Sequence, residues 1–279
     1  MVNYPLSPKA KRSGQGYIDI CPAHEDKNPS LSITETKDGK LLLHCFSGCT
    51  FEEIIAAAGL SSGQFTRATS VQNRGTITSD ADRTAQALNI WNATQSLEGS
   101  VAELYLNSRQ IFIWSDDIRF HPNLYYADDQ TERPCMVCAV RRDGKFVGIH
   151  RTFLTGDGKK LGKKMLGPCG GGSVFVGGTG NVIAVAEGIE NALSVRTLFG
   201  NANGKYYATL SATGMKQWQL PKRMGTLIIF PDGDKVGSDA ALQLGERASL
   251  KGWNAKTMLI VEDKDWNDLL CAKQKDMKL

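Results

Sequence analysis

Four residues near the start of the chain have the types and the spacing of a tetrahedral metal site. Two residues separate Cys21 from His24, three separate Cys45 from Cys49, and twenty lie between the two pairs. Thiolates and imidazoles are the ligands that zinc prefers, and paired ligands at such spacings are typical of structural zinc. A unit this small buries little apolar surface, so bound metal would stabilise it. We therefore predict structural Zn²⁺ bound by Cys21, His24, Cys45 and Cys49.

A second group of residues that could do chemistry is acidic and lies in the last third of the chain. Glu187, Asp232 with Asp234, and Asp265 each follow an apolar run that is typical of a buried strand. Because the carboxyl ends of parallel strands meet in one crevice, we expect these side chains to lie close together. Clustered carboxylates repel one another unless cations neutralise them, and oxygen ligands suit Mg²⁺ or Mn²⁺. The pattern predicts a divalent metal site.

A basic segment lies between these two groups. Residues 133–164 hold nine lysines and arginines against two acids, a net charge of +7, whereas the whole chain carries +4. Clustered cations displace counterions from phosphates, so the segment could bind a polyanion, and a solvated face is the alternative. The candidate contacts for nucleic acid or nucleotide are Arg141, Arg142, Arg151, Lys163 and Lys164.

The elements around the zinc candidates read as a small β-rich unit. Residues 31–36 and 40–45 flank Lys37-Asp38-Gly39, which is a hairpin signal. Thr50 is a suitable N-cap for a helix over 51–58, and Gly59 ends it. His44 neighbours Cys45 on a strand and should point the other way, so it is left out of the ligand set. The polar stretch 61–80 reads as a linker.

The remaining elements predict an α/β fold. Two helices are expected within 82–108, broken near Gly99, followed by strands over 136–140 and 146–153 that the Asp143-Gly144 turn joins. Residues 167–180 contain seven glycines and read as a loop. After that, strands alternate with helices, which predicts a mostly parallel sheet covered on both faces. The strands are expected at 182–186, 206–210, 227–230 and 257–261, and the helices at 189–198, 238–251 and 266–272.

The other cysteines and the apolar content exclude several classes. The chain has seven cysteines and no secretory segment, so a disulfide framework is improbable and the cytoplasm of a bacterial host cell is expected. Cys135 and Cys138 fall in a strand pattern that points them to opposite faces, which favours packed thiols over a metal pair. No stretch reaches 18 uncharged apolar residues, so no membrane contact is expected.

Several of these motifs together resemble those of phage, plasmid and other mobile-element DNA primases. The sequence AEGIENALS at 186–194, FPDGD at 230–234 and DWND at 265–268 closely resemble the Toprim domain of these primases. The sequence CPAHEDKNPSLSI at 21–33 and HCFSGC at 44–49 look like their zinc-binding domain. Between them, AELYL at 102–106 with Arg109, IRFHP at 118–122 and GIHRT at 148–152 also look like that family.

The resemblance implies a domain order. It places a zinc-ribbon unit at 1–60, a linker at 61–80, the helical and basic N-terminal part of the polymerase region at 81–180, and a Rossmann-like Toprim domain at 181–279. The implied function is synthesis of short RNA primers on a single-stranded DNA template from ribonucleoside triphosphates. The resemblance also implies that the zinc domain reads the template.

The resemblance also implies residue roles. Glu187 matches the glutamate assigned to acid–base chemistry at the attacking 3′-hydroxyl, Asp232 and Asp234 match the metal-binding pair, and Asp265 matches a supporting acid. The cellular replicative primases carry an acid four positions after the glutamate, where this chain has Asn191, with Glu190 one residue earlier.

Two other functions use the same features. A Toprim nuclease would use these carboxylates to activate water, and a non-catalytic accessory would only bind single-stranded DNA. The zinc unit and linker favour a primase over a nuclease, and the intact Glu187, Asp232 and Asp234 count against an accessory. A Toprim topoisomerase would need a strand-cleaving tyrosine domain, for which the chain is too short. No phosphate-binding Gly-x-x-x-x-Gly-Lys-Ser/Thr motif is present, so a separate helicase is the expected partner.

Overall fold

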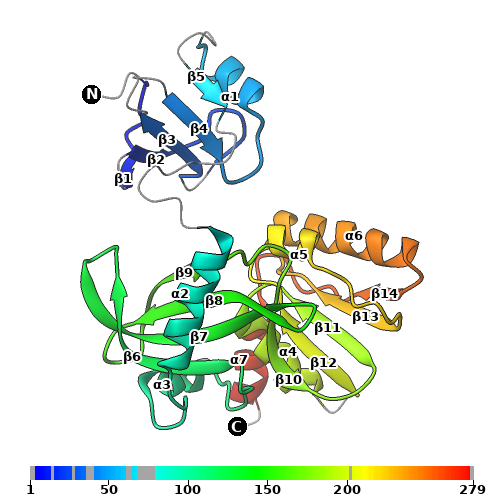
Figure 1. The fold of residues 1–279 in the computed structure, drawn as a ribbon. Coiled ribbons are helices and arrows are strands. Elements are labelled where there is room, and N and C mark those ends of the chain that lie inside the picture. The colour runs from blue at the N-terminus through cyan, green and yellow to red at the C-terminus, as the bar shows by residue number, and fades with distance from the viewer. Residues whose placement is uncertain are drawn as a thin grey trace. The chain divides into compact units, whose positions relative to one another are not determined.

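The computed structural model divides into two compact units, Met1–Ile77 and Thr78–Leu279 (Figure 1). The structure describes residues 4–13, 16–26, 29–35, 41–60, 65–67, 79–200 and 203–276. Most of the predicted linker 61–80 and the tip of the predicted hairpin at 37–39 lie outside the described residues.

The described residues of the N-terminal unit form a five-stranded sheet and one helix. The strands follow chain order and pair antiparallel, except that β4 and β5 are parallel. The predicted hairpin is confirmed, because Leu31 pairs with Cys45 and Glu35 with Leu41. Thr50 caps the helix through a capping box with Glu53, also as predicted. The elements are β1 (Lys11–Ser13), β2 (Gly16–Asp19), β3 (Leu31–Glu35), β4 (Leu41–Cys45), α1 (Phe51–Ala57) and β5 (Phe65–Arg67).

The second unit begins with two helices and a four-stranded antiparallel sheet in the order β6-β7-β8-β9. Helix α2 packs on one face of this sheet, where Ala87 and Trp91 meet Val137 and Ile149. Cys135 and Cys138 are buried in separate apolar clusters, which confirms the prediction of packed thiols on opposite faces. The elements are α2 (Asp80–Asn92), α3 (Val101–Ser108), β6 (Ile118–Tyr126), β7 (Thr131–Arg142), β8 (Lys145–Leu154) and β9 (Lys160–Leu166).

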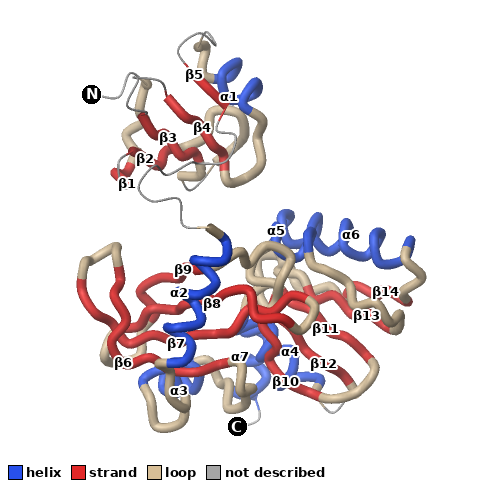
Figure 2. The backbone as a smooth tube through the Cα atoms, viewed as in Figure 1, coloured by secondary structure: helices blue, strands red, loops and turns tan. Residues whose placement is uncertain are grey.

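The C-terminal part is the predicted mostly parallel sheet covered on both faces (Figures 1 and 2). Its order is β10-β12-β11-β13-β14, and only β10 is antiparallel to its neighbour. The elements are β10 (Val174–Gly178), β11 (Val182–Ala186), α4 (Ile189–Phe199), β12 (Gly204–Ala208), α5 (Ala212–Gln217), β13 (Thr226–Phe230), α6 (Lys235–Leu250), β14 (Asn254–Thr257) and α7 (Trp266–Asp276).

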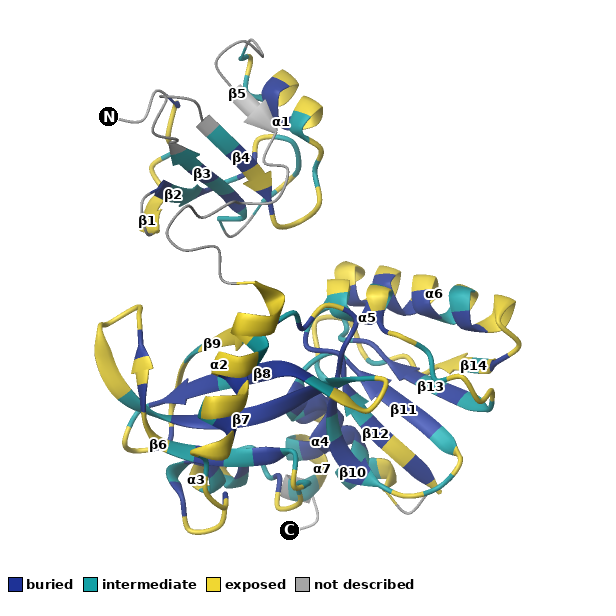
Figure 3. Ribbon diagram, viewed as in Figure 1, coloured by how far each residue is buried: buried dark blue, intermediate teal, exposed yellow. Residues whose placement is uncertain are grey.

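Strand β11 shows how the sheet divides its side chains between the two faces. Ile183 and Val185 pack with α5 and α6, whereas Ala184 and Ala186 pack with α4 and α7. Strands β7, β8 and β11 are largely buried, while the outer faces of α2 and α6 are exposed (Figure 3). The cluster around Ala184 also includes Met136 and Cys138 of β7, so the two sheets of this unit share one core.

Two predicted elements differ in the structure. The glycine-rich stretch 167–180 is not all loop, because β10 lies inside it. Gly177 permits this, since its φ is +120° and the Arg196 side chain occupies the space a Cβ would need. The strand predicted at 257–261 is also wrong: β14 ends at Thr257, and Leu259 and Val261 lie beyond it, 82% and 72% exposed.

Besides β10, six of the described elements were not predicted from the sequence, namely β1, β2, β5, β6, β9 and α5. Among the described helices, none has the length and apolar content that a bilayer crossing requires.

Candidate active site and zinc site

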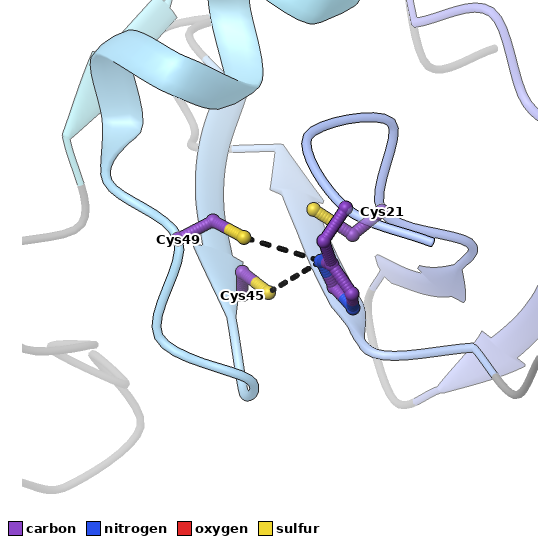
Figure 4. A group of neighbouring side chains, drawn as sticks. Cys21, Cys45 and Cys49 are labelled. Carbon is purple, nitrogen blue, oxygen red and sulfur yellow. Dashed lines mark hydrogen bonds between the residues drawn. The ribbon is translucent and has the colours of Figure 1, made fainter. Parts of the chain in front are cut away.

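The four predicted zinc ligands come together in the N-terminal unit (Figure 4). Their ligand atoms all lie within 4.8 Å of one another. The Nδ1 atom of His24 lies 3.1 Å from Sγ of Cys49 and 3.9 Å from Sγ of Cys45. Three sulfurs and one imidazole nitrogen at this separation fit a tetrahedral zinc ion.

The surrounding residues support these ligands. Cys45 is buried on β4, whereas His44 is exposed and its ring meets Phe46, as the alternation of a strand requires. Burial would raise the pKa of Cys45, but the backbone N–H groups of Cys49 and Ser47 lower it overall, which favours the thiolate that binds metal. Oδ2 of Asp26 lies 3.7 Å from Nε2 of His24, where a carboxylate can orient the ring.

Two of the predicted acidic residues lie at the carboxyl ends of adjacent parallel strands, whereas Asp265 lies between β14 and α7. Glu187 follows β11 directly, and Asp232 follows β13 after Pro231. Ala186 and Phe230 are paired in register, so both strands end at the same level. Asp234 caps α6 by accepting a hydrogen bond of 2.6 Å from the backbone N–H of Gly237.

A cavity of about 370 Å³ lies beside the two aspartates. Asp232, Asp234 and Ser238 line it, together with Glu262 from the loop after β14. Glu262 was not predicted from the sequence, because it follows the apolar stretch that was interpreted as a longer strand. These oxygen atoms are of the kind that hold Mg²⁺ or Mn²⁺.

The backbone of Gly233 links the loop after β13 to the loop after β14. Its N–H donates to the carbonyl of Lys264 at 2.9 Å, and its carbonyl accepts from the N–H of Asp263 at 3.0 Å. An added Cβ at Gly233 would lie 2.4 Å from the Val261 carbonyl oxygen, so this approach requires glycine. The contact brings Asp265 close enough to Asp232 for its charge to raise the Asp232 pKa.

The carboxylates influence one another strongly. Burial and the charges of Asp232 and Asp234 raise the pKa of Glu187 from its usual value of 4.5 to about 7. The Lys163 ammonium opposes this rise, so Lys163 also faces the group. Burial raises the pKa of Asp232, while its hydrogen bond from Asn191 lowers it. Perturbed carboxyl groups clustered at strand ends are typical of active sites.

A buried network of amides holds Asp232 in place. Nδ2 of Asn191 donates to Oδ1 of Asp232 at 2.6 Å, and Oδ1 of Asn191 accepts from the N–H of Asn267 at 3.3 Å. Asn267 in turn donates to the Arg109 carbonyl at 2.8 Å and to Oγ of Ser194 at 3.0 Å. Asn191 and Asn267 were not among the predicted site residues, because neither can carry charge.

Glu190 is occupied by other partners. The Tyr105 hydroxyl and the Lys160 ammonium both contact its Oε1, the ammonium at 3.0 Å. Burial would raise the pKa of Glu190, but the charge of Lys160 and the Tyr105 hydroxyl hold it below its usual value. Glu190 therefore joins α4 to α3 and β9.

The basic segment 133–164 forms most of β7, β8 and β9, and acids pair with five of its nine cations. Four of these acids lie outside the segment in sequence, so its net charge overstates its free positive charge. The pairs are Arg133 with Asp129, Arg141 with Asp117, Lys159 with Asp157, Lys160 with Glu190, and Lys164 with Asp128.

The five predicted phosphate contacts are not brought to one place. Arg151 and Lys164 pair across β8 and β9 on one face of the sheet, whereas Lys163 pairs with buried Thr152 on the other face, toward Glu187 and Asp232. Nη2 of Arg151 donates to the Met165 carbonyl at 3.1 Å. Arg141 and Arg142 lie at the far end of β7, beside a separate groove.

Comparison with protein families divides the chain into three matches. Residues 7–61 match the CHC2 zinc finger, residues 81–176 match a domain of unknown function, and residues 182–276 match the Toprim domain. A DNA primase of Enterococcus faecalis is 46% identical over 39 residues, which are 14% of this chain and 6% of that primase.

Several solved primase structures are similar to this chain at low identity. The zinc-binding and RNA polymerase domains of the Aquifex aeolicus primase are 15% identical, with 96% of this chain and 78% of that chain covered and a TM-score of 0.45. The RNA polymerase domain of Mycobacterium tuberculosis primase DnaG is 18% identical (71% and 81% covered, TM-score 0.41). The primase fragment of the bacteriophage T7 primase-helicase is 14% identical (63% and 68% covered, TM-score 0.38).

Proposed function

We propose that this DnaG-like primase, with its CHC2 zinc finger and Toprim domain, synthesises short RNA primers on single-stranded DNA. The observation that carries the proposal is the group of carboxylates at the ends of β11 and β13, where Asp232 and Asp234 border one cavity and raise the pKa of Glu187.

Asp232 and Asp234, supported by Asp265, are proposed to hold Mg²⁺ or Mn²⁺. When bound, such ions neutralise the triphosphate and favour ionisation of the attacking hydroxyl. The carboxylate and hydroxyl oxygens that line the cavity suit these hard cations, and Lys235 also lies in the lining. Asn191 keeps one Asp232 oxygen in a fixed direction through its hydrogen bond, which leaves the other oxygen available to a cation.

Glu187 is proposed to accept the proton of the primer 3′-hydroxyl. A general base works best when its pKa lies near the working pH, and the pKa of about 7 meets this condition. Metal bound at the neighbouring aspartates would reduce the repulsion that raises this pKa. Glu187 would then be ionised more fully and ready to accept the proton.

Lys163 is proposed to contact the incoming ribonucleoside triphosphate. It lies close enough to Glu187 and Asp232 to affect the pKa of both. In the part of the chain that the structure describes, no carboxylate lies within ion-pair distance of Lys163, so its charge is available to a phosphate. Arg141, Arg142 and Arg151 are proposed to contact template or nucleotide at the positions given above, and Lys164 is proposed to contact the template only.

The zinc unit is proposed to contact the single-stranded template. Its ligands fit structural Zn²⁺, which would stabilise the sheet that β1 to β5 form. We further propose that the chain acts in the bacterial cytoplasm beside a separate replicative helicase.

One assay tests the function against its alternatives. Purified protein is mixed with single-stranded template, labelled ribonucleotides and Mg²⁺ or Mn²⁺, and the products are separated on a gel. Short labelled RNA supports the primase. Template fragments would instead indicate a Toprim nuclease, and a retarded but unchanged template would indicate a non-catalytic accessory.

A further inference from the structure

A strained turn lies beside Glu187, and the proposed mechanism does not yet use it. The turn runs from Thr209 to Ser211 and joins β12 to α5. Leu210, at its centre, has a φ of +76°. A leucine in this left-handed region is unusual, because its Cβ lies too close to a backbone carbonyl oxygen. Such a conformation persists only where the surroundings enforce it, and examples concentrate at functional sites.

The turn is hydrogen-bonded to the backbone of Glu187. The N–H of Leu210 donates to the Glu187 carbonyl at 2.7 Å, and the N–H of Thr209 donates to the Ala186 carbonyl at 2.9 Å. These bonds lie directly after Ala186 and Ala208, the last paired residues of β11 and β12. The direction of the backbone at Glu187 therefore depends on the conformation of Leu210.

Other contacts hold the turn in this conformation. The Leu210 side chain is buried in the core that the two sheets share. Ser211 caps α5 by accepting a hydrogen bond of 2.9 Å from the N–H of Gly214. An added Cβ at Gly214 would lie 2.0 Å from the Thr209 carbonyl oxygen, so the start of α5 packs directly against Thr209. The strain at Leu210 is thus enforced by the core on one side and by α5 on the other.

The carboxylate of Glu187 also meets this turn. Among the described residues, no side chain donates a hydrogen bond to it. Burial is the main cause of the raised pKa of Glu187, and the backbone N–H of Ala212, the first residue of α5, opposes that rise. An N–H at this position has no partner within its own helix, so it is available to the carboxylate. A general base must be held within hydrogen-bond reach of the proton that it accepts.

We propose that Leu210 is a positioning residue for Glu187: its left-handed backbone places the Leu210 N–H on the Glu187 carbonyl and the Ala212 N–H beside the Glu187 carboxylate. The inference rests on the proposed function and adds to it the element that directs the base. Leu210 acts through its backbone conformation, whereas its side chain fills the core. These two roles predict opposite results for two substitutions.

The first test compares Leu210→Gly with Leu210→Ile in steady-state primer synthesis by the full chain, with zinc and Mg²⁺ present. Glycine adopts a positive φ freely, so Leu210→Gly should keep kcat within about threefold, although loss of the buried side chain lowers its thermal stability. Isoleucine keeps the apolar volume, but a β-branched residue does not hold this φ. Leu210→Ile should therefore lower kcat by about 10- to 100-fold with KM nearly unchanged. Leu106→Ile, in the same core cluster on α3, is the matched control and should keep a normal kcat.

A second test removes the Ala212 N–H alone. Proline is tolerated at the first position of a helix, and Ser211 is extended, with φ −169° and ψ +165°, as a residue before proline should be. Ala212→Pro should lower kcat by about tenfold, as expected for one lost hydrogen bond to a charged group, while Ala212→Ser keeps the donor and a normal rate. Neither Ala212→Pro nor Leu210→Ile should lower the residual rate of Glu187→Gln further, because both act through Glu187.

Amide hydrogen exchange tests the geometry without any activity. The backbone N–H of residue 210 should exchange slowly in the unaltered protein and in Leu210→Gly, and at least about tenfold faster in Leu210→Ile, where its acceptor is lost. If the unaltered protein makes no primers, the proposed function fails, and this exchange pattern still decides the inference about Leu210.

Four results would overturn the inference. Leu210→Ile could keep its kcat while Leu210→Gly loses it, which would assign Leu210 to packing alone. Ala212→Pro could match Ala212→Ser. Leu210→Ile or Ala212→Pro could slow Glu187→Gln further, which would indicate a general disturbance of the fold. The N–H of residue 210 could exchange at the same rate in the glycine and isoleucine variants.

Discussion

The Nδ2 atom of Asn191 donates a hydrogen bond of 2.6 Å to Oδ1 of Asp232, which joins α4 to the loop after β13. The bond lowers the pKa of Asp232 against the effects of burial and of Asp265 and Asp234. Asn191 is therefore a neutral hydrogen-bond donor at a position where another acid would add to the repulsion among the carboxylates. This arrangement makes Asn191 the first residue to alter.

We expect Asn191→Asp to impair primer synthesis at low Mg²⁺ by about tenfold, since one pKa unit of added repulsion is worth ~1.4 kcal/mol. The loss should shrink as Mg²⁺ is raised, because the cation neutralises the added charge. Asn191→Ala removes the donor without adding charge, so its loss should not respond to Mg²⁺ in this way. A Mg²⁺ titration of the initial rate checks both, and equal curves for Asn191→Asp and the unaltered protein would contradict the prediction.

Glu187→Gln should lower the rate of primer synthesis by at least ~10²-fold, because the amide cannot accept a proton. Asp232→Asn and Asp234→Asn should abolish metal-dependent synthesis through loss of the cation ligands. Template affinity should survive in all three variants, since the zinc unit and the arginines of β7 and β8 are unchanged. Gel assays of primers, with template binding measured in parallel, check this. Near-normal synthesis by Glu187→Gln would remove Glu187 from the chemistry.

The raised pKa of Glu187 predicts how stability depends on pH in metal-free protein. The folded state keeps the proton up to about pH 7, while the unfolded chain loses it near 4.5. The free energy of unfolding should therefore fall as pH rises through this window and stay low above it. The loss is at most about 3–4 kcal/mol, at ~1.4 kcal/mol per pKa unit.

Urea unfolding at pH 5 and pH 8 measures this effect. Glu187→Gln should remove most of the pH dependence, whereas Glu246→Gln, at an exposed position on α6, should keep it. Added Mg²⁺ should restore stability at pH 8 in the unaltered protein. A free energy of unfolding that rises between pH 5 and pH 8 would have the wrong sign for a protonated Glu187.

Zinc content gives a prediction for the N-terminal unit alone. The unaltered protein should hold about one zinc ion per chain, and Cys45→Ser should reduce it nearly to zero because one of the four ligands is lost. Cys271→Ser, whose thiol lies outside the ligand cluster, should keep the metal. Elemental analysis measures the metal, and limited proteolysis should show residues 4–60 cleaved first in Cys45→Ser. Full zinc in that variant would exclude this ligand set.

Lys163 and Lys164 are adjacent but should behave differently. Lys163→Ala should raise the KM for ribonucleotides by about tenfold, because its ammonium faces the carboxylate site. Lys164→Ala should change KM by less than about twofold, since Lys164 pairs with Asp128 at 2.8 Å in an exposed ion pair, which contributes ~0–1 kcal/mol. Steady-state kinetics at saturating template checks the pair. Equal effects of the two substitutions on KM would contradict the prediction that the ribonucleotide meets only the face of β9 that carries Lys163.

The structure confirms the fold class predicted from sequence, because the signals for it are local. The apolar runs 182–186 and 227–230 are buried strands, and each is followed closely by an acid. The zinc ligands come together because a hairpin folds back on itself. The ion pairs of the basic segment were harder to predict, because the acidic partners of Arg133, Arg141, Lys160 and Lys164 lie elsewhere in the sequence.

The groove beside Arg141 and Arg142, which Phe175, Tyr207 and Trp218 help to line, could not be predicted from sequence patterns for a similar reason. Phe175, Tyr207 and Trp218 are far apart along the chain, and only the pairing of β10 with β12 brings the first two together. The glycines around β10 led to the prediction of a loop there. No local sequence pattern shows that the Arg196 side chain fills the space beside Gly177. The apolar stretch after Thr257 was misleading because exposed Leu259 and Val261 have the composition of a core strand.

The two hydrogen bonds at Gly233 have a consequence for how the acidic loops meet a cation. Because the backbone of Gly233 is already tied to Asp263 and Lys264, the loop segments that carry Asp232 and Asp265 are ordered before any ion arrives. Little conformational entropy remains to be lost on binding. Replacement of Gly233 by alanine would break this tie, and cation binding would then carry the entropic cost of ordering two separate loops.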